Sequence, residues 1–367
     1  MKRPLGLGLT LFTAALAAPI RAVPVINADF FPYSHGRLGA DAAYSVPLDP
    51  TTTVWLFGDT FVGNRRGTNT MIHNSIAIRR CGESCELTYW WSGQRTRNPD
   101  AFFKTPQSNY FWPLDGFTHG GKLYVFLEQM RATGEGGAFG FDYRSVSLAT
   151  VSNPTVDPDK WLVSYNLVSE GNHVVPGIAT AVVKESNRTY AYIFTLFRRS
   201  APRPFVGLIR CPVNHLPSAN NKPPWQYLSS SSRWLDWSPS TSPSDAWEAF
   251  GGNVTEMSVK HHPESDSWLA VFPTPGLFSK TASYSIARHL SGPWTAPRSF
   301  FTYPEMEKND PRYTPSIFCY AAKEHPELES SGVLVFTYAC NSLKEAEIFA
   351  DTRLYRPELV EEKLPVH

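Results

Sequence analysis

Hydrophobic positions along the chain gather into short runs rich in β-branched and aromatic residues, with polar turns between them. Five of these runs resemble one another, and each follows a polar turn such as His119-Gly120-Gly121. The five runs cover residues 53–59, 122–127, 189–196, 267–272 and 332–338. Runs of this length and composition predict β-strands rather than helices. They recur at a regular interval of about 65 to 78 residues, which indicates an internal repeat.

The same order of strands recurs around each run. A shorter candidate strand precedes the run, a third strand follows it, and a Trp-bearing segment often closes the unit. The preceding strands cover residues 41–46, 113–117, 178–183, 255–259 and 315–320, and the third strands cover 75–80, 145–151, 206–211, 283–290 and 348–354. Four antiparallel strands repeated five times predict an all-β fold, the five-bladed β-propeller. A pair of β-sandwiches is the alternative, but it does not predict one four-part order five times over.

The N-terminal residues predict a leader and a closing strand. Residues 1–22 read as a secretory signal peptide, because Lys2 and Arg3 precede an apolar stretch at residues 5–18 and small residues follow. A membrane anchor is the alternative, but the stretch is shorter than the roughly 20 residues that a span needs. Residues 23–367 are then a single propeller domain, secreted and extracellular. Within it, residues 23–31 are expected to complete the last blade and so close the ring.

Composition excludes several classes of protein. The chain has 367 residues, of which 42% are hydrophobic, 14% aromatic and 18% charged, too apolar for a disordered protein. Lys and Arg number 34 against 33 Asp and Glu, so the balanced charge argues against a nucleic-acid partner. Loss of the leader would make the chain slightly acidic, which suits a neutral glycan. We expect a monomer that does not bind membranes once the leader is cleaved.

The cysteines and sequons fit an oxidising, secretory environment. The five cysteines are Cys81, Cys85, Cys211, Cys319 and Cys340. An odd number leaves at least one unpaired. Cys81 with Cys85 and Cys319 with Cys340 are the candidate disulfides, although sequence does not fix the connectivity. No spacing matches a structural zinc site. Two sequons, at Asn187 and Asn253, are candidate glycosylation sites.

Carboxylates on the predicted inner strands are the candidate catalytic groups. Asp41, Asp115 and Glu256 lie on or beside the first strands of blades one, two and four, which line the axis of a propeller. Convergent carboxyls suit glycoside hydrolysis, where one protonates the leaving oxygen and another acts as base or nucleophile. Asp59, at the end of the second strand of blade one, is a fourth candidate. The alternative for each is an acid that caps a turn, above all for Asp59 and Asp115 beside glycine.

Neighbouring residues are candidate sugar-binding groups. Trp112 and Tyr313 could stack on sugar rings, and His73 and Asn74 could hydrogen-bond hydroxyl groups. The alternative for an aromatic residue in a β protein is a place in the core. Signatures of other enzymes are missing from the sequence, including the Gly-x-Ser-x-Gly elbow, His-Glu-x-x-His, phosphate-binding glycine loops and sialidase Ser-x-Asp-x-Gly-x-Thr-Trp turns.

Several motifs resemble those of a known family. They are Gly39-Ala40-Asp41, Val54-Trp55-Leu56-Phe57-Gly58-Asp59-Thr60, Asn74-Ser75, Trp112-Pro113-Leu114-Asp115-Gly116, Thr255-Glu256-Met257-Ser258-Val259 and Gly292-Pro293-Trp294. From about residue 29 to 354 the chain resembles secreted propellers catalogued as a domain of unknown function, a family that includes endo-D-arabinanases. It is more distantly similar to five-bladed arabinanases, xylosidases and invertases.

The resemblance implies roles for individual residues. It makes Asp41 the base or nucleophile and Glu256 the acid, and it adds weight to Asp59 beside Asp41. The arabinanase pattern has an orienting Asp in blade three that this chain lacks, so Asp115 or Asp59 would have to replace it. A calcium ion on the propeller axis is also implied, without a ligand set; no other cofactor is expected.

Two functions follow from these observations. The first is a secreted glycoside hydrolase that cleaves an arabinan-like or related polysaccharide with paired carboxyl groups. The alternative is a non-catalytic glycan-binding propeller. The empty position in blade three favours it, as does the sequon at Asn253, three residues from Glu256, where a glycan would crowd the site.

Overall fold

The computed structural model describes residues 24–363 of the chain, apart from positions 28, 35, 64–68, 95, 97, 106–108, 136–137, 172, 199–202, 217–222, 239–242 and 331. The expected signal peptide at residues 1–22 therefore lies outside the described residues. Within them, no helix is long and apolar enough to cross a lipid bilayer.

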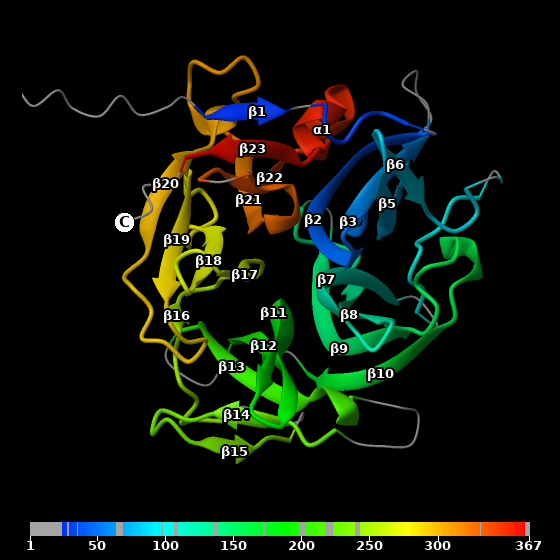
Figure 1. The fold of residues 1–367 in the computed structure, drawn as a ribbon. Coiled ribbons are helices and arrows are strands. Elements are labelled where there is room, and N and C mark those ends of the chain that lie inside the picture. The colour runs from blue at the N-terminus through cyan, green and yellow to red at the C-terminus, as the bar shows by residue number, and fades with distance from the viewer. Residues whose placement is uncertain are drawn as a thin grey trace, which may run out of the picture.

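Five antiparallel sheets stand around a common axis, with the first strand of each sheet innermost (Figure 1). Blade one contains β2 (Arg37–Asp49), β3 (Thr52–Gly63), β5 (Ser75–Cys81) and β6 (Cys85–Trp90), with β4 (Asn69–Ile72) on β3. Blade two contains β7 (Asn109–His119), β8 (Lys122–Ala132), β9 (Phe141–Val151) and β10 (Val163–Glu170). Blade three contains β11 (Val174–Glu185), β12 (Arg188–Phe197), β13 (Phe205–Pro212), β14 (Gln226–Leu228) and β15 (Trp234–Asp236), with β16 (Phe250–Gly251) on β13.

The remaining two blades complete the ring. Blade four contains β17 (Ser258–His262), β18 (Ser267–Pro273), β19 (Thr281–Ala287) and β20 (Arg298–Thr302). Blade five contains β21 (Ile317–Glu324), β22 (Leu334–Ser342), β23 (Glu358–Glu362) and β1 (Val25–Asn27). The predicted all-β, five-bladed propeller is confirmed.

The two ends of the described chain meet in blade five. Val25 of β1 pairs with Glu361 of β23, and Figure 1 shows the blue N-terminal strand alongside the red C-terminal one. The expectation that the N-terminal segment completes the last blade is thus confirmed. This pairing covers the edge of β23 that would otherwise be open.

One predicted strand is wrong. Residues 348–354 were expected to form the third strand of blade five, but they lie in helix α1 (Glu345–Ala350) and in a single 3-10 turn (Thr352–Tyr355). The Asp351 side chain accepts a hydrogen bond from the Arg353 amide and so caps this turn. The third strand is β23 instead. This difference matters for the candidate site, because Ile348 of the helix and Tyr355 of the turn line the cavity described below.

Four of the five inner strands contain a register shift. Pairing slips at residues 40–44 of β2, 113–116 of β7, 176–179 of β11 and 320–323 of β21. Ala42 and Ala43 in β2 and Ala321 in β21 have positive φ values of 64°, 66° and 61°. A bulge bends its strand and redirects the neighbouring side chains. The bulges therefore decide which inner-strand residues face the axis.

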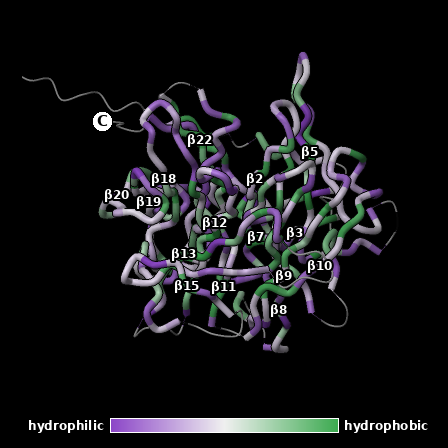
Figure 2. The backbone as a smooth tube through the Cα atoms, turned by 60° about the horizontal axis from the view of Figure 1, so that its bottom comes forward, coloured by the Kyte–Doolittle hydropathy of each residue, from purple (hydrophilic) through white to green (hydrophobic). Residues whose placement is uncertain are grey.

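Apolar side chains fill the space between blades. Figure 2 shows hydrophobic colour along the strands and hydrophilic colour mainly in the loops that join them. Both candidate disulfides are present: Cys81–Cys85 joins β5 to β6, and Cys319–Cys340 joins β21 to β22. Cys211 is free and buried. The two bonded pairs agree with the prediction.

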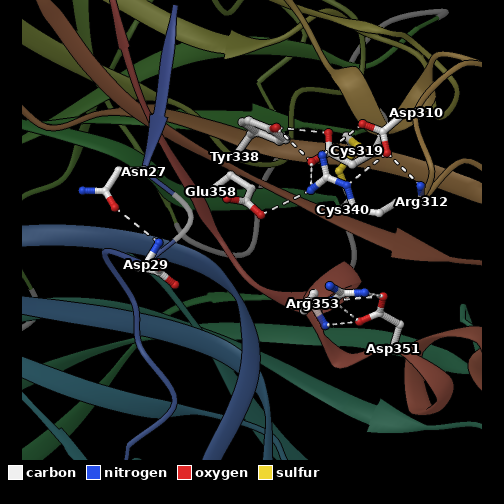
Figure 3. Close-up of polar contacts among 11 residues, drawn as sticks. Asn27, Asp29, Asp310, Arg312, Cys319, Tyr338, Cys340, Asp351, Arg353 and Glu358 are labelled. Atoms are coloured by element: carbon white, nitrogen blue, oxygen red, sulfur yellow. Dashed lines mark hydrogen bonds and ion pairs between the residues drawn. A yellow bond between two sulfur atoms is a disulfide. The ribbon is translucent and has the colours of Figure 1, made fainter.

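A buried ion-pair network lies beside the second disulfide (Figure 3). The Arg312 guanidinium pairs with Glu305 at 2.8 Å, Asp310 at 3.1 Å and Glu358 at 3.5 Å. The Tyr338 hydroxyl donates to both oxygens of Glu305. Burial raises the pKa of Glu305, whereas the Arg312 charge opposes that rise. The Arg312 charge thus stabilises three carboxylates, two from the segment before β21 and one at the start of β23.

Candidate active site

A cavity of about 1120 Å³ opens at one end of the propeller axis, and all five blades contribute to its wall. Its volume is slightly above the range of about 300–1,000 Å³ that is usual for small-molecule sites, which suits several linked sugar rings. Its acidic, basic and aromatic lining residues include Asp41, Asp59, His73, Tyr110, Trp112, Glu128, Arg198, Glu256, Tyr320 and Tyr355.

Asp41 is anchored by blade five. Its Oδ2 atom accepts hydrogen bonds from the Tyr320 hydroxyl at 2.6 Å and from the Tyr355 hydroxyl at 2.7 Å. Tyr320 comes from the bulged strand β21, and Tyr355 from the 3-10 turn after α1. The carboxylate is thus held at the junction of the first and last blades, where the ring closes.

Two glycines of the blade-one motifs make room for this arrangement. A Cβ atom on Gly58 would lie 2.3 Å from Oδ1 of Asp41, and one on Gly39 would lie 2.3 Å from the carbonyl oxygen of Tyr355. Both separations are far inside van der Waals contact. Because Gly58 has no side chain, there is space for the Asp41 carboxylate beside it. Gly39 likewise lets the turn that contains Tyr355 approach β2 closely.

Asp41 sits in an environment that favours its protonated form. Burial, followed by the charges of Asp59 and Glu256, raises the pKa of Asp41 to about 7. The two tyrosine hydroxyls oppose this rise because they donate to the ionised carboxylate. A carboxyl group with a pKa near neutrality is a stronger base than a solvent-exposed one and exchanges its proton at physiological pH.

Asp59 is fixed by the aromatic wall of the cavity. Its Oδ1 atom accepts a hydrogen bond from the Trp112 indole at 2.9 Å and lies 3.0 Å from Nδ1 of His73. The His73 ring stacks on Tyr110 with ring centroids 3.7 Å apart. Three of the predicted residues, Asp59, His73 and Trp112, therefore form one contact group in the cavity wall.

Glu256 lies on the wall that blade four contributes, just before β17, and forms an ion pair with Lys323 of blade five. Lys323 is 1% exposed, and its ammonium lies 4.2 Å from the centre of the Tyr44 ring. Burial lowers the pKa of Lys323, and the Glu256 carboxylate opposes that shift. The Glu256 carboxylate thus neutralises a buried ammonium at the edge of the cavity.

Glu128 is a cavity residue that sequence reasoning missed. It lies on β8, lines the cavity, and pairs with Arg198 at 3.3 Å. Burial raises the pKa of Glu128, an effect that Arg198 opposes and the charge of Glu256 adds to. Lys323, Tyr320, Tyr355 and Arg198 were missed as well. Only Tyr320, within an inner strand, carried a usable signal; the other positions depend on which segments meet at the axis.

Three predicted residues are not brought to the cavity. Asp115 is 1% exposed and accepts hydrogen bonds from the amides of Gly116 and Thr180 and from the Thr180 hydroxyl. Asn74 is fully buried, and its amide group donates to the carbonyls of Phe103 and Phe111. Tyr313 packs half-buried against the core of blade five. Their contacts favour structural roles for all three.

The sequons differ in their placement. Asn253 is exposed and contributes to the cavity wall near Glu256. Asn187 is exposed in the tight turn between β11 and β12. A glycan on Asn253 would narrow the cavity, whereas one on Asn187 would not touch it.

Metal-ligating side chains gather at two places in the described part of the chain, and of these residues Cys319 alone lines the cavity. One group contains Glu305 with Cys319 and Cys340, whose sulfurs are already joined in a disulfide. The other contains His262, Glu324 and Glu329. The described cavity residues therefore supply no side-chain cluster that fits the axial calcium implied by the family resemblance.

Comparison with protein families shows to which family the chain belongs. The family model described as a domain of unknown function, DUF5005, matches residues 27–362. The chain belongs to the DUF5005 family. The match runs from the last residue of β1 to the end of β23 and so takes in strands of all five blades. No curated protein sequence matches the chain.

Solved structures show the same architecture. A protein from Bacteroides ovatus named as a hydrolase candidate matches with a TM-score of 0.67 and 16% identity over 90% of this chain and 87% of its own. An exo-β-1,3-galactanase from Phanerochaete chrysosporium matches with a TM-score of 0.49 and 10% identity over 92% of this chain and 64% of its own. An α-L-arabinanase from Cellvibrio cellulosa matches with a TM-score of 0.43 and 13% identity over 88% of this chain and 91% of its own. At such identities the first likeness establishes the fold of this DUF5005 chain and not its activity.

Proposed function

We propose that the axial cavity is the active site of a glycoside hydrolase, with Asp41 and Glu256 as its carboxyl pair. The observation that carries the proposal is the placement of Asp41. Its carboxyl group lines the cavity, two tyrosine hydroxyls fix one of its oxygens, and burial with neighbouring charges raises its pKa to about 7. A structural carboxylate would have its oxygens saturated by backbone amides, as those of Asp115 are.

The two carboxyl groups have different partners and therefore different roles. Asp41 is the base or nucleophile, the role that the family resemblance implies: with a pKa of about 7 it is partly ionised at neutral pH, and two tyrosine hydroxyls donate to Oδ2 of the ionised form. Glu256 is the acid, the role that the family resemblance implies, and the ammonium of the paired Lys323, whose pKa burial lowers, supplies the proton that passes to the leaving oxygen. Asp59, fixed by Trp112 and His73, adds the negative charge that keeps Asp41 basic.

The wall of the cavity suits a carbohydrate. Trp112, Tyr110 and the stacked His73 ring form an aromatic part of the cavity wall beside the Asp59 carboxylate, and such aromatic and polar neighbours suit a sugar ring. The cavity volume exceeds the needs of one monosaccharide. We therefore propose an oligosaccharide or polysaccharide of the arabinan-like class as substrate, bound by a monomer. The two disulfides support a secreted enzyme.

A glycan-binding propeller without turnover is the second candidate. The sequon at Asn253 in the cavity wall favours it, because a glycan there would obstruct the approach to Glu256. Intact-mass analysis of protein from a eukaryotic host distinguishes the two functions. Full occupancy of Asn253 in a sample that binds glycans but releases no sugar would support binding alone.

The hydrolase proposal is tested on a panel containing arabinans, arabinogalactan, galactan and xylan. Asp41→Asn and Glu256→Gln are each expected to lower the rate of sugar release by about 100- to 10,000-fold. Asp266→Asn is the control, since that side chain is 85% exposed in a turn of blade four. Wild-type rates in both carboxyl variants would overturn the assignment. Proton NMR of the first product then gives the stereochemical outcome.

A further inference from the structure

A second cluster of titratable residues lies between blades four and five, away from the cavity. His262 ends β17, Glu324 ends β21, and Glu329 follows the 3-10 turn Pro326–Leu328. One ligand atom from each residue lies within 4.8 Å of the others, and His262 Nε2 is 2.5 Å from Glu324 Oε1. None of the three lines the cavity. Glu324 lies four residues beyond Tyr320, or about 13 Å farther along the strand.

Glu324 has an oxygen without a partner. Its side chain is fully buried, and Oε2 has no hydrogen-bond donor among the described residues. The backbone fixes this position, because the Glu324 amide donates to the Ser258 hydroxyl at 2.8 Å. A buried, unpaired carboxylate oxygen is costly. It therefore indicates a positively charged ligand.

The charges in and around the cluster also indicate a positively charged ligand. The carboxylate oxygens of Glu324 and Glu329 lie within 4.8 Å of each other, a separation at which two like charges repel unless a cation lies between them. The lysines of the same two strands, Lys260 and Lys323, form their ion pairs with other carboxylates. Within the described residues, His262 is thus the one basic side chain paired with this carboxylate pair.

We propose that His262, Glu324 and Glu329 bind a divalent metal ion of the zinc class. An imidazole nitrogen with two carboxylate oxygens is a donor set typical of zinc, and a water molecule completes four-coordination. Calcium and magnesium prefer oxygen donors alone. Ligand atoms about 2.0–2.2 Å from the metal stand farther apart than the present His262–Glu324 contact, so that contact opens slightly on binding. The ion would join β17 to β21 and so pin blade five to blade four.

The site is tested by metal binding to the full chain. Protein stripped with EDTA and dialysed is titrated with zinc chloride by calorimetry, and bound zinc is counted by mass spectrometry. We expect one equivalent of zinc, and a rise in Tm of about 3–6 °C when free zinc exceeds its Kd a hundredfold. No binding to the wild-type chain, or a larger Tm rise with calcium than with zinc, would overturn the proposal.

Variants separate specific from adventitious binding. His262→Gln and Glu329→Gln are expected to abolish the zinc-dependent rise in Tm, and both side chains are partly exposed, so both variants should fold. His261→Gln is the matched control, because the neighbouring imidazole packs on Trp268 and pairs with Asp266. Zinc stoichiometry that is unchanged in His262→Gln, or lost equally in His261→Gln, would contradict the assignment.

Discussion

Asp41 and Asp115 occupy comparable places in blades one and two, yet the structure uses them differently. Each lies within the register shift of its inner strand, beside a residue that departs from regular pairing. Asp41 faces the cavity and is held by two tyrosine hydroxyls from the last blade. Asp115 is sealed between blades two and three, where the amide and hydroxyl of Thr180 saturate one of its oxygens.

The donors explain the difference. Backbone amides are fixed in space, so Asp115 ties its strand to β11 and also lies 3.9 Å from the ammonium of Lys260. Tyrosine hydroxyls leave the second oxygen of Asp41 available, and no cation pairs with Asp41 among the described residues. A buried carboxylate with fixed donors stabilises a fold, whereas one with an available oxygen and a raised pKa can do chemistry.

The strongest test of this contrast is to remove each charge in turn. Asp41→Asn should lower hydrolysis by at least about 100-fold while the protein still folds. Asp115→Asn should keep hydrolysis within a few-fold of wild type but lower the free energy of unfolding by about 2–3 kcal/mol, because its amide group faces the Thr180 donors. Rates on polysaccharide and urea denaturation measure the two effects. The contrast fails if Asp115→Asn is the variant that loses activity.

The second test moves the Asp41 carboxyl without replacing it. Gly58→Ala places a methyl group 2.3 Å from the present position of Oδ1 and should lower kcat by about 10- to 100-fold. Gly82→Ala is the control, because a Cβ atom there meets no other atom within 4 Å. Equal rates for the two variants would show that the position of this carboxylate does not matter for turnover.

The third test uses stability and needs no substrate. Because the pKa of Asp41 is about 7 in the folded protein and near 4 in the unfolded chain, the folded state binds an extra proton between these values. The free energy of unfolding then falls as pH rises through this window. Asp41→Asn lacks this dependence, so it should gain up to a few kcal/mol relative to wild type between pH 4 and 8. Denaturation curves at several pH values measure the gain; parallel curves for both proteins would contradict the raised pKa.

The smallest effect is expected from one tyrosine donor. Tyr355→Phe removes one of the two hydrogen bonds to Oδ2 of Asp41, while Tyr320 keeps the other. Loss of a donor to the ionised carboxylate raises the pKa of Asp41 further. The rising limb of the kcat/KM profile should therefore move to higher pH, with a few-fold loss at pH 7. A profile that moves to lower pH would oppose the role of Asp41 as base.

Much of the architecture could be predicted from periodicity. The repeated β-branched runs, the turns between them and the closing strand at residues 25–27 follow from local pattern, because strands and polar turns are encoded by neighbouring residues. The error at residues 348–354 has a local cause as well. Glu345, Glu347 and two alanines favour a helix, and the third strand begins only at Glu358.

The sequence by itself thus determined the five-fold repeat and the inner strands that bring carboxylates toward one axis, and it predicted the ring closure and the two candidate disulfides that the structure then showed. Only the tertiary structure decided that Asp41, Asp59 and Glu256 share the cavity while Asp115, Asn74 and Tyr313 lie outside it. The physical reason is that a bulge redirects side chains along a strand, and no local pattern encodes the bulges of four strands together. Lys323 and Tyr355 reach their carboxylates across blades, from positions more than 60 and 300 residues away in the chain.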